Sequence, residues 1–164
     1  MTFNGRVPKR RTGSLRPADV TVIIPVVNES DNLRDCLRSA KQAGTDKIIV
    51  VDGGSSDGSR SLAAQLGATV IESEPGRGLQ QHAGAIAADT PLLCFLHADT
   101  RLSSEALVVL CEYSNHQTEV YACFRQMIQA RGWKYRLLEW GNRCRVQWRR
   151  RPYGDQGICI SSAL

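Results

Sequence analysis

The stretch Lys47–Gly58, with the sequence Lys-Ile-Ile-Val-Val-Asp-Gly-Gly-Ser-Ser-Asp-Gly, decides how the rest of the chain is interpreted. Ile48–Val51 is a short apolar run rich in β-branched residues, which is typical of a strand buried on both faces. Asp52 follows directly, and a glycine- and serine-rich turn then leads into the helix-like segment Ser59–Leu66. Because ligands of open α/β sheets bind outside the carboxyl ends of the strands, this stretch indicates either a ligand site or a tight connecting loop.

The residues before this stretch predict a β-α-β unit. Val20–Val27 is a second buried strand, and Pro25 near its end cannot donate to a ladder, so we expect pairing to stop there or the strand to lie at an edge. Asn32–Ala43 has apolar residues at helical spacing, and Gly44 ends the predicted helix. A strand, a helix and a strand in this order favour a right-handed crossover and a parallel pair.

The same alternation continues downstream. Ala68–Glu72 is a third predicted strand, Ser73–Leu79 a loop, Gln80–Ala88 a helix whose small residues indicate close packing on the sheet, and Leu92–Leu96 a fourth strand. A further helix is expected over Ser103–Glu112. The pattern predicts a single α/β domain with a mostly parallel sheet flanked by helices, over residues 20–164.

Composition is consistent with an ordinary globular domain. The 164 residues are 42% hydrophobic and 23% charged, and the formal net charge of +5 mildly favours anionic partners. Residues 1–19 carry five basic side chains and no apolar stretch of an export signal, so we expect a disordered basic tail. The six cysteines form no Cys-x-x-Cys pair. Reduced thiols and a cytoplasmic location, or one at the inner face of the membrane, are therefore expected.

Acidic side chains recur at the predicted strand ends. Asp99 follows the strand Leu92–Leu96 as Asp52 follows its own strand, and Glu29 follows the first. Such carboxylates can hold Mg²⁺ or Mn²⁺ together with ligand phosphates. Asp99 could instead cap the next helix. Arg77, between two glycines, can clamp an anion or can be an ordinary surface arginine.

At this point the motifs resemble a known family. Val22-Ile23-Ile24-Pro25 with Asn28-Glu29, then Val50–Gly58, then Phe95-Leu96-His97-Ala98-Asp99-Thr100 occur in the order found in family 2 glycosyltransferases, which are nucleotide-sugar-dependent enzymes of the GT-A (Rossmann-like) fold. With Tyr153-Gly154-Asp155-Gln156-Gly157, the motifs look like one bacterial branch, some of whose members are named carotenoid-acid glycosyltransferases. The resemblance covers about Val20 to Ile160.

The resemblance implies a set of site residues. A UDP- or GDP-linked sugar donor would be bound by residues at the strand ends and in the loop before the fourth strand: Pro25, Asn28, Glu29, Asp52, Gly54, Arg77 and Ala98. Asp99 matches the last residue of the metal-binding Asp-x-Asp motif, and His97 takes the place of its first aspartate. The implied cofactor is Mn²⁺ or Mg²⁺, which neutralises charge on the leaving diphosphate.

One expected part is missing. Members of the family continue to a Glu-Asp pair that supplies the catalytic base, and no Glu-Asp pair occurs in this sequence. Asp155 is then the candidate base, or the chain binds a nucleotide without catalysing transfer, or it is truncated at its C-terminus. We favour truncation, because the final residues end within an element.

The segment Trp133–Arg151 combines tryptophan, other apolar residues and arginine. It suits contact with a membrane surface and a lipid or carotenoid-type acceptor, contact with single-stranded nucleic acid, or simple packing of a helix with a basic end. Nucleic acid is the less favoured partner. A dinucleotide-dependent oxidoreductase is a further alternative, although no Gly-x-Gly-x-x-Gly follows the first strand, and the lack of a Gly-Lys-Ser/Thr sequence excludes a P-loop enzyme.

Overall fold

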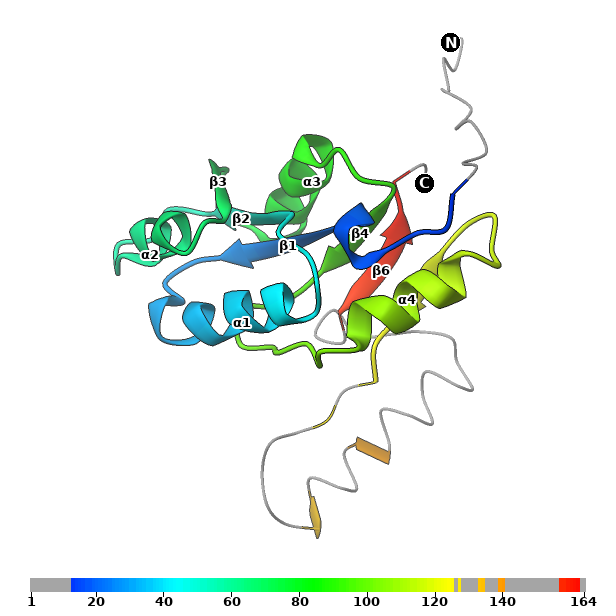
Figure 1. The fold of residues 1–164 in the computed structure, drawn as a ribbon. Coiled ribbons are helices and arrows are strands. Elements are labelled where there is room, and N and C mark those ends of the chain that lie inside the picture. The colour runs from blue at the N-terminus through cyan, green and yellow to red at the C-terminus, as the bar shows by residue number, and fades with distance from the viewer. Residues whose placement is uncertain (1–12, 126, 128–132, 135–138, 141–156, 163–164) are drawn as a thin grey trace, which may run out of the picture.

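A computed structural model describes residues 13–125, 127, 133–134, 139–140 and 157–162. In this part of the chain six strands form one sheet in the order β3-β2-β1-β4-β6-β5. Helices cover both faces of the sheet (Figure 1). The elements are η1 (Pro17–Asp19), β1 (Val20–Val26), α1 (Ser30–Gln42), β2 (Ile48–Asp52), α2 (Ser59–Gln65), β3 (Thr69–Glu72), α3 (Arg77–Ala87), β4 (Leu92–Phe95), α4 (Ala106–Ser114), β5 (Tyr121–Cys123) and β6 (Ile158–Ser161).

The first four strands are parallel, as the sequence predicts, and β1 is central. It pairs with β2 from Val22–Ile48 to Val26–Asp52 and with β4 up to Ile23–Phe95. On the β4 side, the last hydrogen bond to β1 runs from Leu96 N to Ile23 O at 2.9 Å. Pro25, two residues later, faces the same side, where pairing has already ended, so its missing N–H breaks no ladder bond. The predicted stop at Pro25 is therefore confirmed on the β4 side only.

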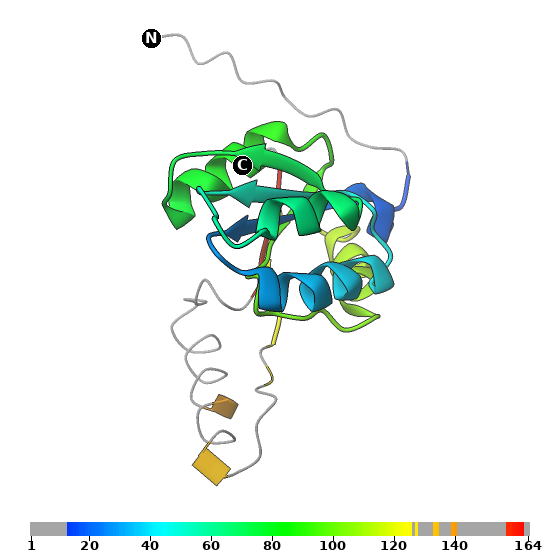
Figure 2. The same cartoon turned by 90° about the vertical axis from the view of Figure 1, so that its left-hand side faces the viewer.

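The sheet has an apolar core on each face. Helices α1, α2 and α4 cover one face, where the side chains of Leu33, Leu37 and Leu107 are fully buried. Helix α3 covers the other face over Ile23 and Val51. Figure 2, turned by 90°, shows the two layers on either side of the sheet. Strands β6 and β5 extend the sheet beyond β4 in antiparallel register.

Several boundaries differ from the sequence expectation. Helix α3 begins at Arg77 instead of Gln80, because Gly76 adopts a φ of 146° and its carbonyl accepts the Gln80 N–H at 2.9 Å. Arg77 therefore lies in the first turn of a helix and not in a loop. Helix α4 begins only at Ala106, after a turn in which Ala106 N donates to Ser103 O.

The folded domain begins before residue 20, within the segment that the sequence predicts to be a tail. Leu15 packs against the core, and its N–H donates to Asn115 Oδ1 at 2.7 Å. The 3₁₀ turn η1 follows directly and leads into β1. The segment just before residue 20 is therefore part of the folded domain, because the end of α4 supplies hydrogen-bond partners for its backbone.

Two negative findings hold for the described residues. The cysteines among them are all free, and Cys36, Cys94, Cys111 and Cys159 are buried as small core residues. No helix among these residues has the length and apolar character needed to cross a bilayer.

Close packing of α3 on the sheet depends on Gly84. A Cβ atom at this position would lie 2.4 Å from Ile23 Cγ2, whereas a Cβ at Gly78 in the same helix would meet nothing within 4 Å. We expect Gly84→Ala to lower the free energy of unfolding by about 1–3 kcal/mol through overpacking. Gly78→Ala should be neutral or raise it by up to about 1 kcal/mol. Urea unfolding of both variants tests this, and equal effects would contradict the packing described here.

Candidate functional site

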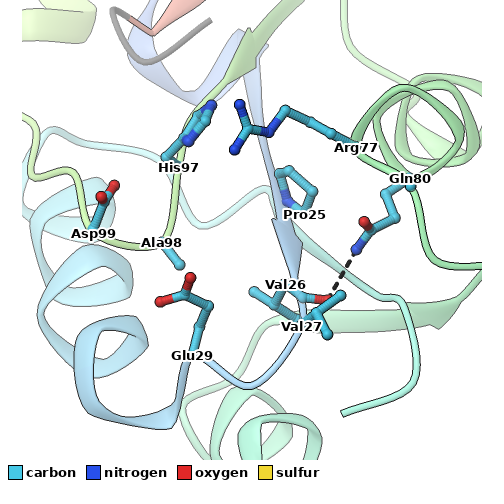
Figure 3. A pocket seen from close by; sticks show the side chains of 10 residues that line it. Pro25, Val26, Val27, Glu29, Arg77, Gln80, His97, Ala98 and Asp99 are labelled. Carbon is cyan, nitrogen blue, oxygen red and sulfur yellow. Dashed lines mark hydrogen bonds between the residues drawn. The ribbon is translucent and has the colours of Figure 1, made fainter.

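A hollow of about 320 Å³ opens at the carboxyl edge of the parallel strands. This is within the usual size range of small-ligand pockets. Figure 3 shows the side chains around it. The lining residues come from the end of β1, the first turn of α3 and the end of β4: Pro25, Val26, Val27, Glu29, Gly76, Arg77, Gln80, His97, Ala98 and Asp99.

The turn after β1 is held by the loop after β2. Asn28 has a φ of 56°, a left-handed conformation that asparagine tolerates. Its N–H donates to Ser55 Oγ at 3.0 Å, and its Oδ1 accepts the Ser56 N–H at 2.8 Å. The Glu29 N–H donates to Ser59 Oγ at 3.0 Å. These bonds fix Glu29 at the rim of the hollow.

Asp57 anchors two helices at once. Its carboxylate accepts the Ser30 N–H of α1 at 2.9 Å and the Ser59 N–H of α2 at 3.0 Å, and it also accepts the Ser59 hydroxyl at 2.6 Å. The hydrogen bond from the Ser59 side chain and that from the Ser30 backbone are the main causes that lower the pKa of Asp57. Helix N-termini favour a negative charge in this position.

Asp52 lies beneath the loop and does not line the hollow. It is 1% exposed, and its carboxylate accepts the N–H groups of Gly54 and Ser55 at 3.1–3.2 Å. Arg60 Nε lies 3.9 Å from Asp52 Oδ2, and the Arg60 guanidinium also pairs with Glu72. The Asp52 carboxylate therefore stabilises the turn at the start of the loop after β2.

The loop after β4 is supported by α1. The Cys36 thiol donates to His97 O at 3.4 Å, and burial raises the pKa of this thiol to about 12, so it stays protonated as a donor. Thr100 N donates to the same carbonyl at 3.0 Å, which closes a turn around Asp99. Arg101 forms an ion pair with Asp35 of α1.

Polar groups remain available around the hollow. His97 Nε2 is buried without a hydrogen-bond partner among the described residues. Arg77 is exposed and has no ion pair in that same part of the chain, and its guanidinium lies opposite the His97 ring in Figure 3. Asp99 is exposed and accepts only a 3.3 Å bond from Thr100 within the described segments. A cationic group and a carboxylate thus face one cavity.

The structure brings together most of the residues that the sequence singles out. Pro25, Glu29, Arg77, His97, Ala98 and Asp99 line the hollow. Asn28 and Gly54 lie in the loops that support it, and Asp52 is the last residue of β2. Asp155 lies outside the described residues, as does most of the Trp133–Arg151 segment.

Sequence reasoning missed Gln80. This side chain is 3% exposed, lines the hollow, and donates from Nε2 to Val26 O at 2.9 Å and to Val51 O at 2.8 Å. One sequence feature could have identified it. Gln80 is a polar residue four positions before Gly84, so it lies on the side of α3 that packs on the sheet.

The anchoring role of Asp57 makes stability depend on pH. Because its folded pKa lies below the ordinary value of 3.8, its contribution is complete above that value and is lost as the pH falls towards the folded pKa. We expect wild type to be more stable than Asp57→Asn at pH 7, with the difference shrinking below about pH 4. Urea unfolding at pH 7, 4 and 3 measures this. The same substitution at exposed Asp46 is the control, and a difference that grows as the pH falls would contradict the assignment.

Comparison with known proteins places the chain in a family. A family model described as glycosyl transferase family 2 matches residues 21–163. An uncharacterised glycosyltransferase of Mycobacterium tuberculosis is 42% identical over 81 residues, which make up 49% of this chain and 36% of that protein. Glycosyltransferase AglJ of Haloferax volcanii is 36% identical over 63 residues, covering 38% of this chain and 21% of that protein. The match thus spans about a third or less of these relatives.

Solved structures share the fold. Glucosyl-3-phosphoglycerate synthase from Mycobacterium tuberculosis, in complex with Mn²⁺ and UDP-glucose, superimposes with a TM-score of 0.62 at 19% identity, over 87% of this chain and 56% of that one. TarS of S. aureus in complex with UDP gives a TM-score of 0.59 at 17% identity, over 69% of this chain and 37% of that one. The sheet order and helices are those of the GT-A fold. Because the family model spans nearly the whole sequence, the chain belongs to glycosyltransferase family 2.

Proposed function

We propose that this chain binds a nucleotide-sugar donor in the hollow and that the protein transfers the sugar to an acceptor with the help of a divalent cation. The observation that carries this proposal is that Arg77 and Asp99 face the same cavity at the carboxyl edge of the sheet. A nucleoside diphosphate needs both groups, one to contact phosphate oxygens and one to hold the cation that bridges them. UDP is the favoured nucleotide, since two structural neighbours were solved with UDP or UDP-glucose.

The first turn of α3 suits the diphosphate. Arg77 is at its first position, and the helix runs from Arg77 to Ala87 with its N-terminus at the hollow. The positive end of the helix dipole and free backbone N–H groups both favour an anion there. The Arg77 guanidinium, which has no ion pair among the described residues, and the positive end of the helix therefore both complement the charge of the phosphates.

The residues present fit a cation that is shared with the ligand. No three histidine, cysteine, aspartate or glutamate side chains gather into a complete metal site in the described segments. Magnesium and manganese often take only one or two protein carboxylates and complete their shell with phosphate oxygens and water. Asp99 would supply the carboxylate. His97 Nε2, which is buried and has no hydrogen-bond partner among the described residues, is the candidate nitrogen ligand. When bound, the cation would neutralise charge on the diphosphate leaving group.

Asn28, Asp52 and Gly54 act in this proposal as positioning residues. Their hydrogen bonds shape the two loops that carry Glu29 and the end of β1. Pro25 and Ala98 provide apolar walls beside the ligand.

The proposed acceptor side carries exposed tryptophan side chains. Trp133 and Trp140 are 72% and 63% exposed, as a membrane-facing pair would be. We place a lipid-linked or other membrane-bound acceptor on this side, at the inner face of the membrane. Asp155 remains the proposed base.

The first test concerns the cation. We expect Mn²⁺ to raise the affinity for UDP by about tenfold or more, equivalent to about 1.4 kcal/mol. Asp99→Ala should abolish this increase because it removes the only proposed carboxylate ligand. Calorimetric titration of UDP with and without Mn²⁺ measures it, with Asp46→Ala as control because Asp46 precedes β2 at the opposite edge of the sheet. Identical Mn²⁺ effects in wild type and Asp99→Ala would rule out this role.

A second test uses the histidine that replaces the first aspartate of the motif. His97→Asp adds a second hard oxygen donor, so we expect Mn²⁺ to bind the UDP complex about tenfold more tightly than in wild type. His97→Asn is the matched control, because it has the same shape as aspartate without its charge. If both variants bind Mn²⁺ equally, position 97 does not contact the cation.

A further inference from the structure

We propose that Ser39 is a positioning residue for the cation, because its buried hydroxyl fixes one end of the loop that carries Asp99. Residues 97–102, between β4 and α4, are called the Asp99 loop. This inference rests on the proposed function, because it assumes that Asp99 binds a cation together with a nucleoside diphosphate. It makes the affinity for that cation depend on a residue of α1 that does not line the hollow.

The Ser39 hydroxyl makes two hydrogen bonds in the protein interior. Ser39 is 6% exposed, and its Oγ accepts the Leu102 N–H at 3.0 Å and donates to Cys36 O at 2.7 Å. A hydroxyl group has one donor and two acceptor sites, so both bonds form at once. Leu102 is buried as well, and among the described residues Ser39 is the partner of its N–H. The last residue of the Asp99 loop is therefore tied to α1.

Cys36, one turn earlier on α1, holds the first residue of the same loop. Its thiol donates to His97 O at 3.4 Å. Residues three positions apart share one side of a helix, so Cys36 and Ser39 face the loop together. Cys36 O is also the acceptor for the Ser39 hydroxyl, which links the two anchors directly. Figure 1 shows the connection from β4 to α4 running alongside α1.

The two anchors determine where the Asp99 carboxylate lies. Asp99 is exposed, and within the described segments its side chain accepts only a 3.3 Å bond from Thr100. Its position is therefore set by the backbone of the loop. Without the Ser39 hydroxyl, the buried Leu102 N–H would lose its partner unless the loop shifted. Because Mg²⁺ and Mn²⁺ sites require precise placement of their oxygen ligands, such a shift weakens cation binding.

The test compares the Mn²⁺ effect, which is the factor by which Mn²⁺ raises the affinity for UDP in calorimetric titrations. We expect Ser39→Ala to reduce this factor by about threefold or more, while its affinity for UDP without Mn²⁺ stays within about twofold of wild type. The matched control is Ser114→Ala. Ser114 is a buried serine of α4 whose hydroxyl donates to Leu110 O at 2.7 Å, and the variant should keep the wild-type factor.

Cys36 and Cys111 supply a second matched pair, which decides the matter if Ser39→Ala does not fold. Both thiols are buried in the same apolar core, but Cys111 lies on α4 and makes no hydrogen bond to the Asp99 loop in the described part of the chain. Cys36→Ala should reduce the Mn²⁺ effect as Ser39→Ala does. Cys111→Ala should leave it unchanged.

The outcomes separate this inference from the proposed function. If Ser39→Ala keeps the full Mn²⁺ effect, or weakens UDP binding equally with and without Mn²⁺, the positioning role is overturned and the proposed function stands. An equal fall of the factor in Ser39→Ala and Ser114→Ala, or in Cys36→Ala and Cys111→Ala, reflects a general loss of stability and also overturns it. If wild type binds no UDP, or binds it without any Mn²⁺ effect, the proposed function fails and this inference fails with it.

Discussion

The hydrogen bonds between the turn after β1 and the loop after β2 are the constraint on which the site depends. Asn28 and Ser30 donate their backbone N–H groups to side chains of the loop after β2, and Glu29 donates to the side chain of the first residue of α2. Without these partners the first turns of α1 and α2 would leave backbone N–H groups unsatisfied. The glycine- and serine-rich sequence after β2 is therefore needed to hold its neighbour as much as to turn the chain.

Helix α1 links these two turns to the loop after β4. Its first turn is anchored by Asp57, and its next turns hold the loop after β4 through the Cys36 thiol and the ion pair between Asp35 and Arg101. On the other face, Gly84 lets α3 approach the sheet, and Gln80 ties it to the ends of β1 and β2. The loops and the helix that carry the groups around the hollow are thus fixed before any ligand arrives, which reduces the ordering cost of binding.

Much of this arrangement could be predicted from the sequence, because buried parallel strands appear as continuous apolar runs and their ends share one edge. The helix boundary at Arg77 could not, since the run Pro75-Gly76-Arg77-Gly78 resembles a loop until the conformation of Gly76 is known. Asp99 could be proposed from its place after an apolar strand and Arg77 from its place between two glycines, and the family resemblance added the metal-binding role of Asp99. The sequence places Asp52 at the ligand site, and only the structure shows that its carboxylate also accepts the backbone N–H groups two and three residues away. Gln80 was missed because its role depends on carbonyl groups from two distant strands, which a local pattern does not reveal.

The central claim is that the hollow holds the phosphates of a nucleotide together with a cation. A crystal structure of this chain with UDP and Mn²⁺ tests it most directly. We predict the diphosphate between Arg77 and Asp99, with the cation at Asp99. A nucleotide bound at any other surface, with this cavity still filled by water, would contradict the account.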